Sequence, residues 1–106
     1  MNLYADDVVF RTHPFREPHI GTDGVRAYVT QAYFDEEDIR AWFAEPFADQ
    51  RAAAVEWWAA GKEQGEPSTL AGCSMLGFGQ DGLAVDQRDY WNMEPGLHEP
   101  HGEWGT

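Results

Sequence analysis

Short connections between extended runs are the feature that most constrains the fold of this chain. Four β-type runs lie between residues 39 and 92: Ile39–Ala48, Arg51–Gly61, Pro67–Phe78 and Leu83–Asn92. Between them lie the turn signals Asp49-Gln50 and Gln80-Asp81-Gly82 and an expected loop, Lys62–Glu66. Antiparallel neighbours can be joined by such short connections, whereas parallel neighbours need a long crossover. The sequence therefore predicts a curved antiparallel sheet whose first run is interrupted at Pro46 by a bulge or an edge position.

A strand and one helix precede these runs. The β-forming run Val8-Val9-Phe10 opens a predicted first strand, Val8–His13, and the prolines and glycine of Pro14–Gly21 predict a loop. The next stretch, Thr22–Phe34, follows an N-cap at Thr22 or Asp23 and has apolar residues along one helical face: Val25, Tyr28, Val29, Ala32 and Tyr33. The combination predicts an α+β fold with the helix packed on the concave side of the sheet.

The length of 106 residues allows one domain with one core. We expect this domain to span residues 1–92. Residues 93–106 are rich in proline and glycine and are predicted to form an extended or partly disordered tail. Fifteen aromatic residues, five of them Trp, are many for so short a chain. They predict a ligand cavity or a sizeable interface in addition to the core.

The charge balance excludes several classes of partner. A net charge of −12 without a cluster of Lys and Arg argues against a nucleic-acid partner and against binding to an anionic membrane surface.

The single cysteine, Cys73, excludes an internal disulfide and fits a reducing compartment. No long apolar run is present, so we expect a soluble, cytoplasmic protein.

Neither a metal site nor a cofactor site is expected. The four histidines include no helical i, i+4 pair, and the pair His98-x-x-His101 lies in the tail. The sequence also contains no phosphate-binding loop and no dinucleotide fingerprint.

The run Leu83–Asn92 carries the most promising polar groups. Two-residue alternation divides its side chains into two sets: Leu83, Val85, Gln87, Asp89 and Trp91, and Ala84, Asp86, Arg88, Tyr90 and Asn92. Neither set is uniformly apolar, which predicts that both faces of this strand are covered. We expect Asp89 and Gln87 to face a pocket. Trp57, Arg88 and Tyr90 are expected on the outer face, in a homodimer contact.

Glu56 is a second candidate acid. Alternation places it on one face with Trp58, and we expect this face to line the pocket, so that Glu56 and Asp89 could share a proton. Alternatively, Glu56 pairs with an arginine and only stabilises the sheet, and Asp89 is satisfied by an arginine or a backbone N–H. Aromatic residues form the core, and some of them line any cavity that is present; the candidates are Phe10, Tyr28, Phe43, Trp58 and Trp91.

Several motifs together resemble the SnoaL-like branch of the nuclear transport factor 2-like superfamily. They are LYADDVVF at residues 3–10, the G-x-x-x-V-R-x-Y entry into the helix, VEWW at residues 55–58 and GLAVDQRDYWN at residues 82–92. The resemblance spans about Leu3 to Asn92. It implies a cone-shaped α+β barrel whose bent sheet wraps around a pocket, commonly in a homodimer. Family members include ketosteroid isomerases, limonene epoxide hydrolases and polyketide cyclases. Relatives usually have a further helix before the LYADD-like segment, which would close one side of the cone.

The resemblance also implies roles for individual residues. Asp89 lies where the epoxide hydrolases have a catalytic Asp, but Glu56 and Trp58 stand where those enzymes need an Arg and a second Asp. His13, before Pro14, lies where the isomerases have the Asp that moves the proton, and an imidazole suits this task. Ser74 lies where the isomerases have an oxyanion donor, and their second donor, on the preceding helix, has no counterpart. Both catalytic arrangements are therefore incomplete.

Two hypotheses follow. The first is a homodimer that binds a small, largely apolar molecule and performs isomerase-, cyclase- or dehydratase-type chemistry without a cofactor, with Asp89, His13 and Glu56 handling protons. In this hypothesis Phe10, Tyr28, Phe43, Trp58, Ser74, Gln87 and Trp91 bind the ligand. The alternative is a non-catalytic binding or dimerisation module.

Overall fold

A computed structural model describes residues 3–33 and 36–105 and has one helix and seven strands in these ranges. In chain order the elements are β1 (Tyr4–Arg11), β2 (His19–Ile20), α1 (Gly21–Tyr33), β3 (Glu36–Phe43), β4 (Phe47–Ala48), β5 (Ala52–Glu63), β6 (Glu66–Phe78) and β7 (Ala84–Pro95). The α+β class is therefore confirmed. The expected helix end at Phe34 lies outside the described residues. No helix in the described ranges is long and apolar enough to span a membrane.

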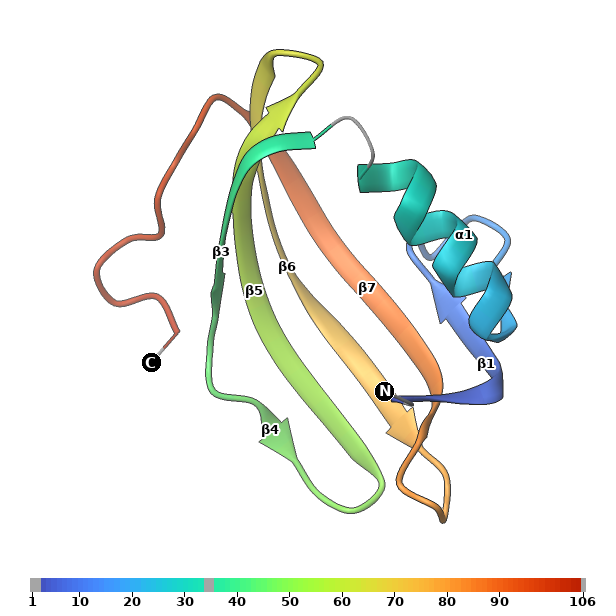
Figure 1. Cartoon of the computed structure of the whole chain (residues 1–106). Helices are drawn as coiled ribbons and strands as arrows, with labels where there is room; N and C mark the ends of the chain where they lie inside the picture. Colours follow the sequence, from blue (N-terminus) through green and yellow to red (C-terminus); the bar gives the residue numbers. More distant parts are fainter. Residues whose placement is uncertain (1–2, 34–35, 106) are drawn as a thin grey trace.

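The strands form one open, strongly curved sheet (Figure 1). The strand order is β2-β1-β7-β6-β5-β3, and β4 pairs with the lower part of β5. The pairs along the chain from β3 to β7 are antiparallel, as the short connections predict. By contrast, β1 pairs with β7 in parallel. Short turns could not predict this pairing, because almost the whole chain separates the two strands.

Several element boundaries differ from the sequence-based expectation. The first strand is β1, Tyr4–Arg11, and not Val8–His13, and β7 continues beyond Asn92 to Pro95. The expected five-residue loop Lys62–Glu66 is only a two-residue turn, Gln64-Gly65, with φ angles of 52° and 81°. Both residues therefore have the left-handed conformation that matches the twist of a tight hairpin. Pro46 does interrupt the first run, leaving β3 and β4 as separate strands.

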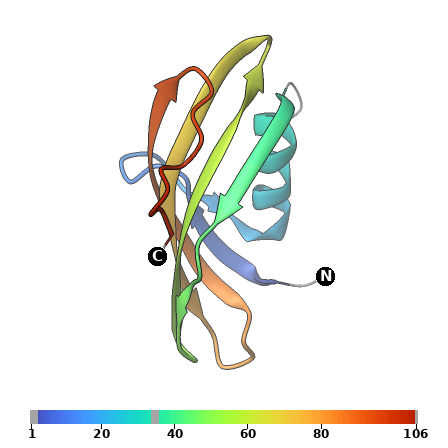
Figure 2. The ribbon, with the colours of Figure 1, turned by 90° about the vertical axis from the view of Figure 1, so that its left-hand side faces the viewer.

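Helix α1 lies on the concave side of the sheet, against β1 (Figures 1 and 2). Val25 of the helix is buried with Val8 and Phe10 of β1 in the apolar core, and the Tyr28 ring packs on Phe10 at a centroid distance of 5.8 Å. We call the sheet face toward α1 the inner face. The opposite, outer face is crossed by the C-terminal segment, residues 96–105, which Figure 2 shows on the side away from α1.

Gly72 allows β6 and β7 to approach closely in the middle of the sheet. A Cβ atom at this position would collide with the Tyr90 carbonyl oxygen and would lie 2.8 Å from the Cβ atom of Trp91. Because these atoms belong to or sit directly on the backbone, they cannot move aside without distorting the strand pair. We predict that Gly72→Ala lowers the free energy of unfolding by about 1–3 kcal/mol in urea unfolding. The control is Gly102→Ala, because a Cβ there meets no atom within 4 Å; equal midpoints for the two variants would contradict the prediction.

Candidate functional site

The candidate site lies on the inner face, where three strands bring polar side chains together. Ser74 of β6 is directly opposite Asp89 of β7 and Val55 of β5. Directly opposite residues point to the same side of a sheet, and alternation then places Trp57 and Gln87 on this side as well. The pairing register thus gathers Trp57, Ser74, Gln87 and Asp89 beneath the concavity that α1 flanks.

Hydrogen bonds join these residues into the Asp89 network, which consists of Tyr4, Trp57, Ser74, Gln87 and Asp89. The Ser74 hydroxyl donates to Asp89 Oδ1 at 2.7 Å, and Gln87 Nε2 donates to the same oxygen at 3.0 Å. Further out, Trp57 Nε1 donates to Ser74 Oγ at 2.9 Å, and the Tyr4 hydroxyl donates to Gln87 Oε1 at 2.7 Å. Each outer side chain donates to an inner one, and both inner side chains donate to Asp89. Asp89 is therefore the final acceptor of the network.

The network fixes one carboxylate oxygen of Asp89 and leaves the other available. Ser74 and Gln87 are only 7% and 9% exposed, so their hydrogen bonds form largely away from water. Asp89 itself is half-buried. Within the described part of the chain, Oδ2 accepts no hydrogen bond. This oxygen can accept a hydrogen bond or a proton from a bound molecule while Oδ1 holds the carboxylate in place.

Tyr4 is held in its protonated form at the far end of the network. Burial raises the pKa of the Tyr4 phenol above its ordinary value of 10.0, and the negative charge of Asp89 raises this pKa further. At neutral pH the phenol therefore remains a donor to Gln87. This bond fixes the amide orientation in which Gln87 Nε2 points to Asp89.

Apolar side chains continue the inner face on one side of Asp89. Trp91 and Met93 follow it along β7, and Phe43 of β3 is directly opposite Trp57 of β5. Trp91, Met93 and Phe43 are all exposed. The indole of Trp91 is held by a 2.8 Å hydrogen bond from Nε1 to the Thr12 carbonyl oxygen. These residues can form the wall against which an apolar ligand would pack.

One predicted wall residue, Phe10, lies in the core, and a second, Tyr28, packs against it. Phe10 is buried, and Tyr28 stacks between Phe10 and the His19 ring at 5.8 Å and 4.6 Å. The position of Phe10 matches the simpler interpretation of the aromatic set as core, whereas Tyr28 is partly exposed and its role in ligand binding stays a prediction.

His13 lies at the rim of the inner face, beyond the end of β1. Its ring is edge-on to Trp91 at a centroid distance of 6.4 Å. The Nδ1 atom accepts a 3.2 Å hydrogen bond from the Phe15 backbone N–H, which places the proton of a neutral ring on Nε2. The structure therefore places His13 beside Trp91, and it has no hydrogen bond to Asp89 in the described residues.

The predicted face of β5 is wrong by one residue. Glu56 is opposite Cys73, and Cys73 is opposite Tyr90, so Glu56 is a solvent-exposed residue of the outer face. Trp58 also lies on the outer face, where its Nε1 atom donates to the His98 carbonyl oxygen at 2.7 Å. Glu56 and Asp89 therefore cannot share a proton, and Trp58 does not line the inner site. Trp57, expected in the dimer contact, takes the inner position.

The prediction for β5 failed because this strand has apolar residues on both of its faces. In VEWWAA, alternation gives Val55, Trp57 and Ala59 on one side and Trp58 and Ala60 on the other, so hydrophobicity alone does not orient the strand. The register is fixed instead by the two-residue turn at Gln64-Gly65. Pairing residues outward from that turn would have placed Trp57 beside Ser74. No comparable signal links Tyr4 to the site, because its partner Gln87 is 83 residues away.

Arg88 and Tyr90 lie on the outer face, as predicted, and both are exposed. Their role in a dimer stays a prediction.

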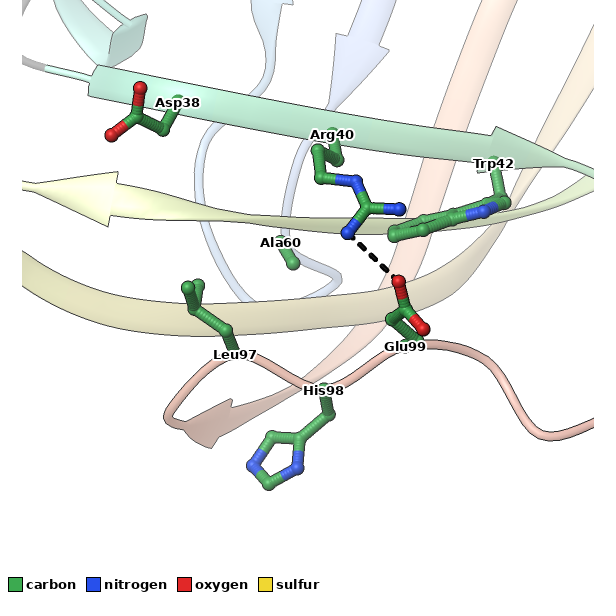
Figure 3. A pocket seen from close by; sticks show the side chains of 7 residues that line it. All are labelled: Asp38, Arg40, Trp42, Ala60, Leu97, His98 and Glu99. Atoms are coloured by element: carbon green, nitrogen blue, oxygen red, sulfur yellow. Dashed lines mark ion pairs between the residues drawn. The ribbon is translucent and has the colours of Figure 1, made fainter.

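A cavity of about 200 Å³ lies elsewhere on the outer side of the sheet, between the C-terminal segment, β3 and β5 (Figure 3). Its lining residues are Asp38, Arg40, Trp42, Ala60, Leu97, His98 and Glu99. In the described residues, no group of three or more His, Cys, Asp or Glu side chains is arranged to hold a metal ion.

Solved structures share this fold at low sequence identity. An NTF2-like protein of unknown function from Exiguobacterium sp. 255-15 is 19% identical with a TM-score of 0.74, and the match covers 85% of this chain and 77% of that chain. The epoxide hydrolase/cyclase-like enzyme SalBIII, described in pyran ring formation in the polyether salinomycin, is 11% identical with a TM-score of 0.73, covering 91% and 78%. A computationally designed 17-OHP binder is 24% identical with a TM-score of 0.71, covering 89% and 81%.

The sequence itself matches a known family. No curated protein matches the chain significantly. The family model of the SnoaL-like domain, however, matches residues 1–87, which include β1, α1 and the network residues from Tyr4 to Gln87. Together with the NTF2-like fold of the solved structures, this match shows that the chain belongs to the SnoaL-like domain family.

Proposed function

We propose that this protein is a cytoplasmic, small-molecule-binding member of its family that binds a small, largely apolar ligand on the inner face. The observation that carries the proposal is the Asp89 network. Four side chains are arranged so that one oxygen of a half-buried carboxylate is fixed, and the other accepts no hydrogen bond within the described ranges. A sheet does not need a carboxylate at this position for its stability, because burying the charge is costly and the hydrogen bonds only offset that cost.

The geometry around Asp89 limits the kind of ligand. The Gln87 and Tyr4 side of the network is closed by the core, whereas the side toward Trp57, Trp91 and Phe43 is apolar and open. The ligand we propose has a flat apolar body that packs on these rings, with a hydroxyl or an acidic C–H group directed to Asp89 Oδ2. That a designed protein of the same fold is a 17-OHP binder supports this use of the scaffold.

The proposed chemistry is acid/base catalysis without a cofactor. A carboxylate that is held on one oxygen can take a proton with the other, as isomerisation, cyclisation and dehydration require. His13, at the rim beside Trp91, is the second group that we propose for proton transfer. The similarity in fold to an epoxide hydrolase/cyclase-like enzyme supports this class of reaction.

A binding module without turnover is the second candidate. It is favoured by the position of Glu56 on the outer face, which leaves Asp89 without a second carboxylate to act as its partner. The two candidates share the same ligand site and differ only in whether the bound molecule is converted.

We also propose that the chain forms a homodimer through the outer face of β6 and β7. Met75 is directly opposite Arg88, and Tyr90 follows on the same face, so an exposed strip combines apolar area with an arginine that forms no ion pair among the described residues. Tyr and Arg are concentrated in the centres of protein interfaces.

The first prediction concerns Asp89 itself. Asp89→Asn removes the charge but preserves the shape, and it should weaken binding of a flat hydroxylated probe such as 17-OHP about 10–150-fold, the loss expected for a hydrogen bond to a charged group. Quenching of tryptophan fluorescence measures the affinity. The matched control is Glu56→Gln, a carboxylate-to-amide change on the outer face, which should leave affinity unchanged. Equal affinities for Asp89→Asn and the unmodified protein would remove Asp89 from the site.

The second prediction concerns alkaline pH. The folded chain holds the Tyr4 proton more tightly than the unfolded chain, because the folded-state pKa is raised above 10.0. The resulting stability is fully present below pH 10 and is lost as the pH rises through the folded-state pKa. Urea unfolding between pH 8 and pH 11 should therefore show a steeper loss of stability in the unmodified protein than in Tyr4→Phe. At pH 8 the variant should be less stable by about 1 kcal/mol, through the lost hydrogen bond to Gln87; parallel pH profiles would contradict this assignment.

The third prediction concerns the dimer. Sedimentation velocity should show a dimer at micromolar concentration for the unmodified protein. Tyr90→Asp should raise the dissociation constant about 30-fold or more, because it places a charge in the proposed contact. Ile20→Asp, at an exposed position of β2, serves as the control and should leave the dimer intact. A monomer in the unmodified protein would refute the dimer without affecting the ligand site on the other face.

A further inference from the structure

The C-terminal segment, residues 96–105, is fixed against the outer face of the sheet. Thr69 of β6 is only 3% exposed, and its hydroxyl donates to the Gly96 carbonyl oxygen at 2.8 Å and accepts from the His98 N–H at 2.9 Å. Trp58 of β5 donates from Nε1 to the His98 carbonyl oxygen at 2.7 Å. The start of the segment is therefore docked and is not a loose tail, and it forms a fixed wall beside β3 and β5.

Between this wall and the two strands lies the 200 Å³ cavity of Figure 3. Liquid water occupies about 30 Å³ per molecule, so the cavity has room for about six or seven waters or for one small organic molecule. Ala60, which is 7% exposed, forms its floor, and Figure 3 shows the Leu97 side chain directed toward this floor. The Trp42 ring adds a flat apolar surface. Part of the cavity is therefore apolar and suits a hydrocarbon group.

An irregularity in β3 brings Asp38 to the cavity. The pairing of β3 with β5 shifts between Glu37 and Arg40, and Asp38, within this shift, has a left-handed φ of 55°. Bulges of this kind re-aim a side chain, and few residues other than glycine adopt such a φ. Within the described ranges the Asp38 carboxylate forms no ion pair and no hydrogen bond. The cavity thus has a negative group whose charge is not matched by the protein.

Arg40 supplies the opposite charge and is held in position. Its Nη1 atom lies 2.8 Å from Glu99 Oε1, and its guanidinium group is 4.9 Å from the centre of the Trp42 ring. An ion pair this exposed contributes little to stability, but together with the ring it orients the guanidinium group. A guanidinium group has five N–H donors, so the contact with Glu99 leaves several of them for another acceptor.

The charges around the cavity select against ligands that carry a single charge. A simple cation would be repelled by Arg40, and a simple anion would be repelled by Asp38 and Glu99 in a protein of net charge −12. Figure 3 shows Asp38 and Arg40 apart along β3, without an ion pair between them. Residues two apart in a strand are separated by roughly 7 Å, which leaves room for an ammonium group and a carboxylate carried by the same carbon atom.

We propose that this cavity binds a free α-amino acid with an apolar side chain of medium size, such as leucine. The ammonium group donates to Asp38, the carboxylate accepts from Arg40, and the side chain packs on Ala60 and Leu97. The site lies on the outer side of the sheet, away from the Asp89 network. It therefore does not depend on the ligand proposed for the inner face.

Isothermal titration calorimetry of the full chain with L-leucine tests the site. Leucinamide keeps the ammonium group but lacks the carboxylate, and 4-methylpentanoate keeps the carboxylate but lacks the ammonium group. Each analogue should bind about tenfold more weakly than leucine, because each loses one charge-assisted hydrogen bond. Equal affinities for leucine and either analogue would overturn the zwitterion assignment, and the absence of saturable leucine binding would overturn the site itself.

Two variants assign the charges to residues. Asp38→Asn removes the charge with a residue that tolerates a left-handed φ, and Arg40→Gln removes the guanidinium group; each should weaken leucine binding about tenfold. The matched controls are Asp23→Asn and Arg26→Gln, which change exposed charges of α1 on the other side of the sheet and should leave leucine affinity unchanged. Unchanged affinity in Asp38→Asn or in Arg40→Gln would overturn the proposed binding mode. Probe binding at Asp89 should be the same in all four variants, which separates this test from that of the inner face.

Discussion

The two-residue turn at Gln64-Gly65 is the constraint on which the rest of the structure depends. It pairs Glu63 with Glu66 and so fixes every cross-strand pair between β5 and β6. A slip of one residue would move each side chain of β5 to the other face of the sheet. Trp57 would leave Ser74, and Trp58 would leave the C-terminal segment. Both the candidate site and the contact of Trp58 with the C-terminal segment therefore depend on the backbone conformation of two residues.

The Asp89 network shows how the same sheet can hold a polar group in an aromatic surrounding. A carboxylate in this position is tolerated because Ser74 and Gln87 donate to it, and each donor is itself fixed by Trp57 or Tyr4. Trp57 and Tyr4 are hydrogen-bonded to the two donors and not to Asp89 itself, but they determine the direction of the inner bonds. A network of this kind fixes the position of Asp89 Oδ1 and leaves Oδ2 without a hydrogen bond in the part of the chain that the structure describes.

Periodicity alone predicted the helix, the last three long strands and the α+β class. It also placed Asp89, Gln87 and Trp91 on one face of β7, because alternation within a strand does not depend on its neighbours. It failed for Glu56 and Trp58, since both faces of β5 are apolar and only the pairing register distinguishes them. The contribution of Tyr4 was also missed, because a parallel pairing between the first and last strands leaves no local signal. The predicted roles of Asp89 and His13 remain hypotheses.

The adjacent residues Trp57 and Trp58 show how one sheet can have separate hydrogen-bonding environments on its two faces. Consecutive side chains of a strand point in opposite directions, so one indole donates to Ser74 on the inner face and the next donates to His98 on the outer face. The backbone between them is shared, whereas their side-chain environments are separate. The contact between Trp58 and the C-terminal segment can therefore change without moving Asp89, provided that the pairing of β5 with β6 is preserved. The separation of the proposed ligand site from the proposed dimer contact follows from the geometry of the β-strand itself.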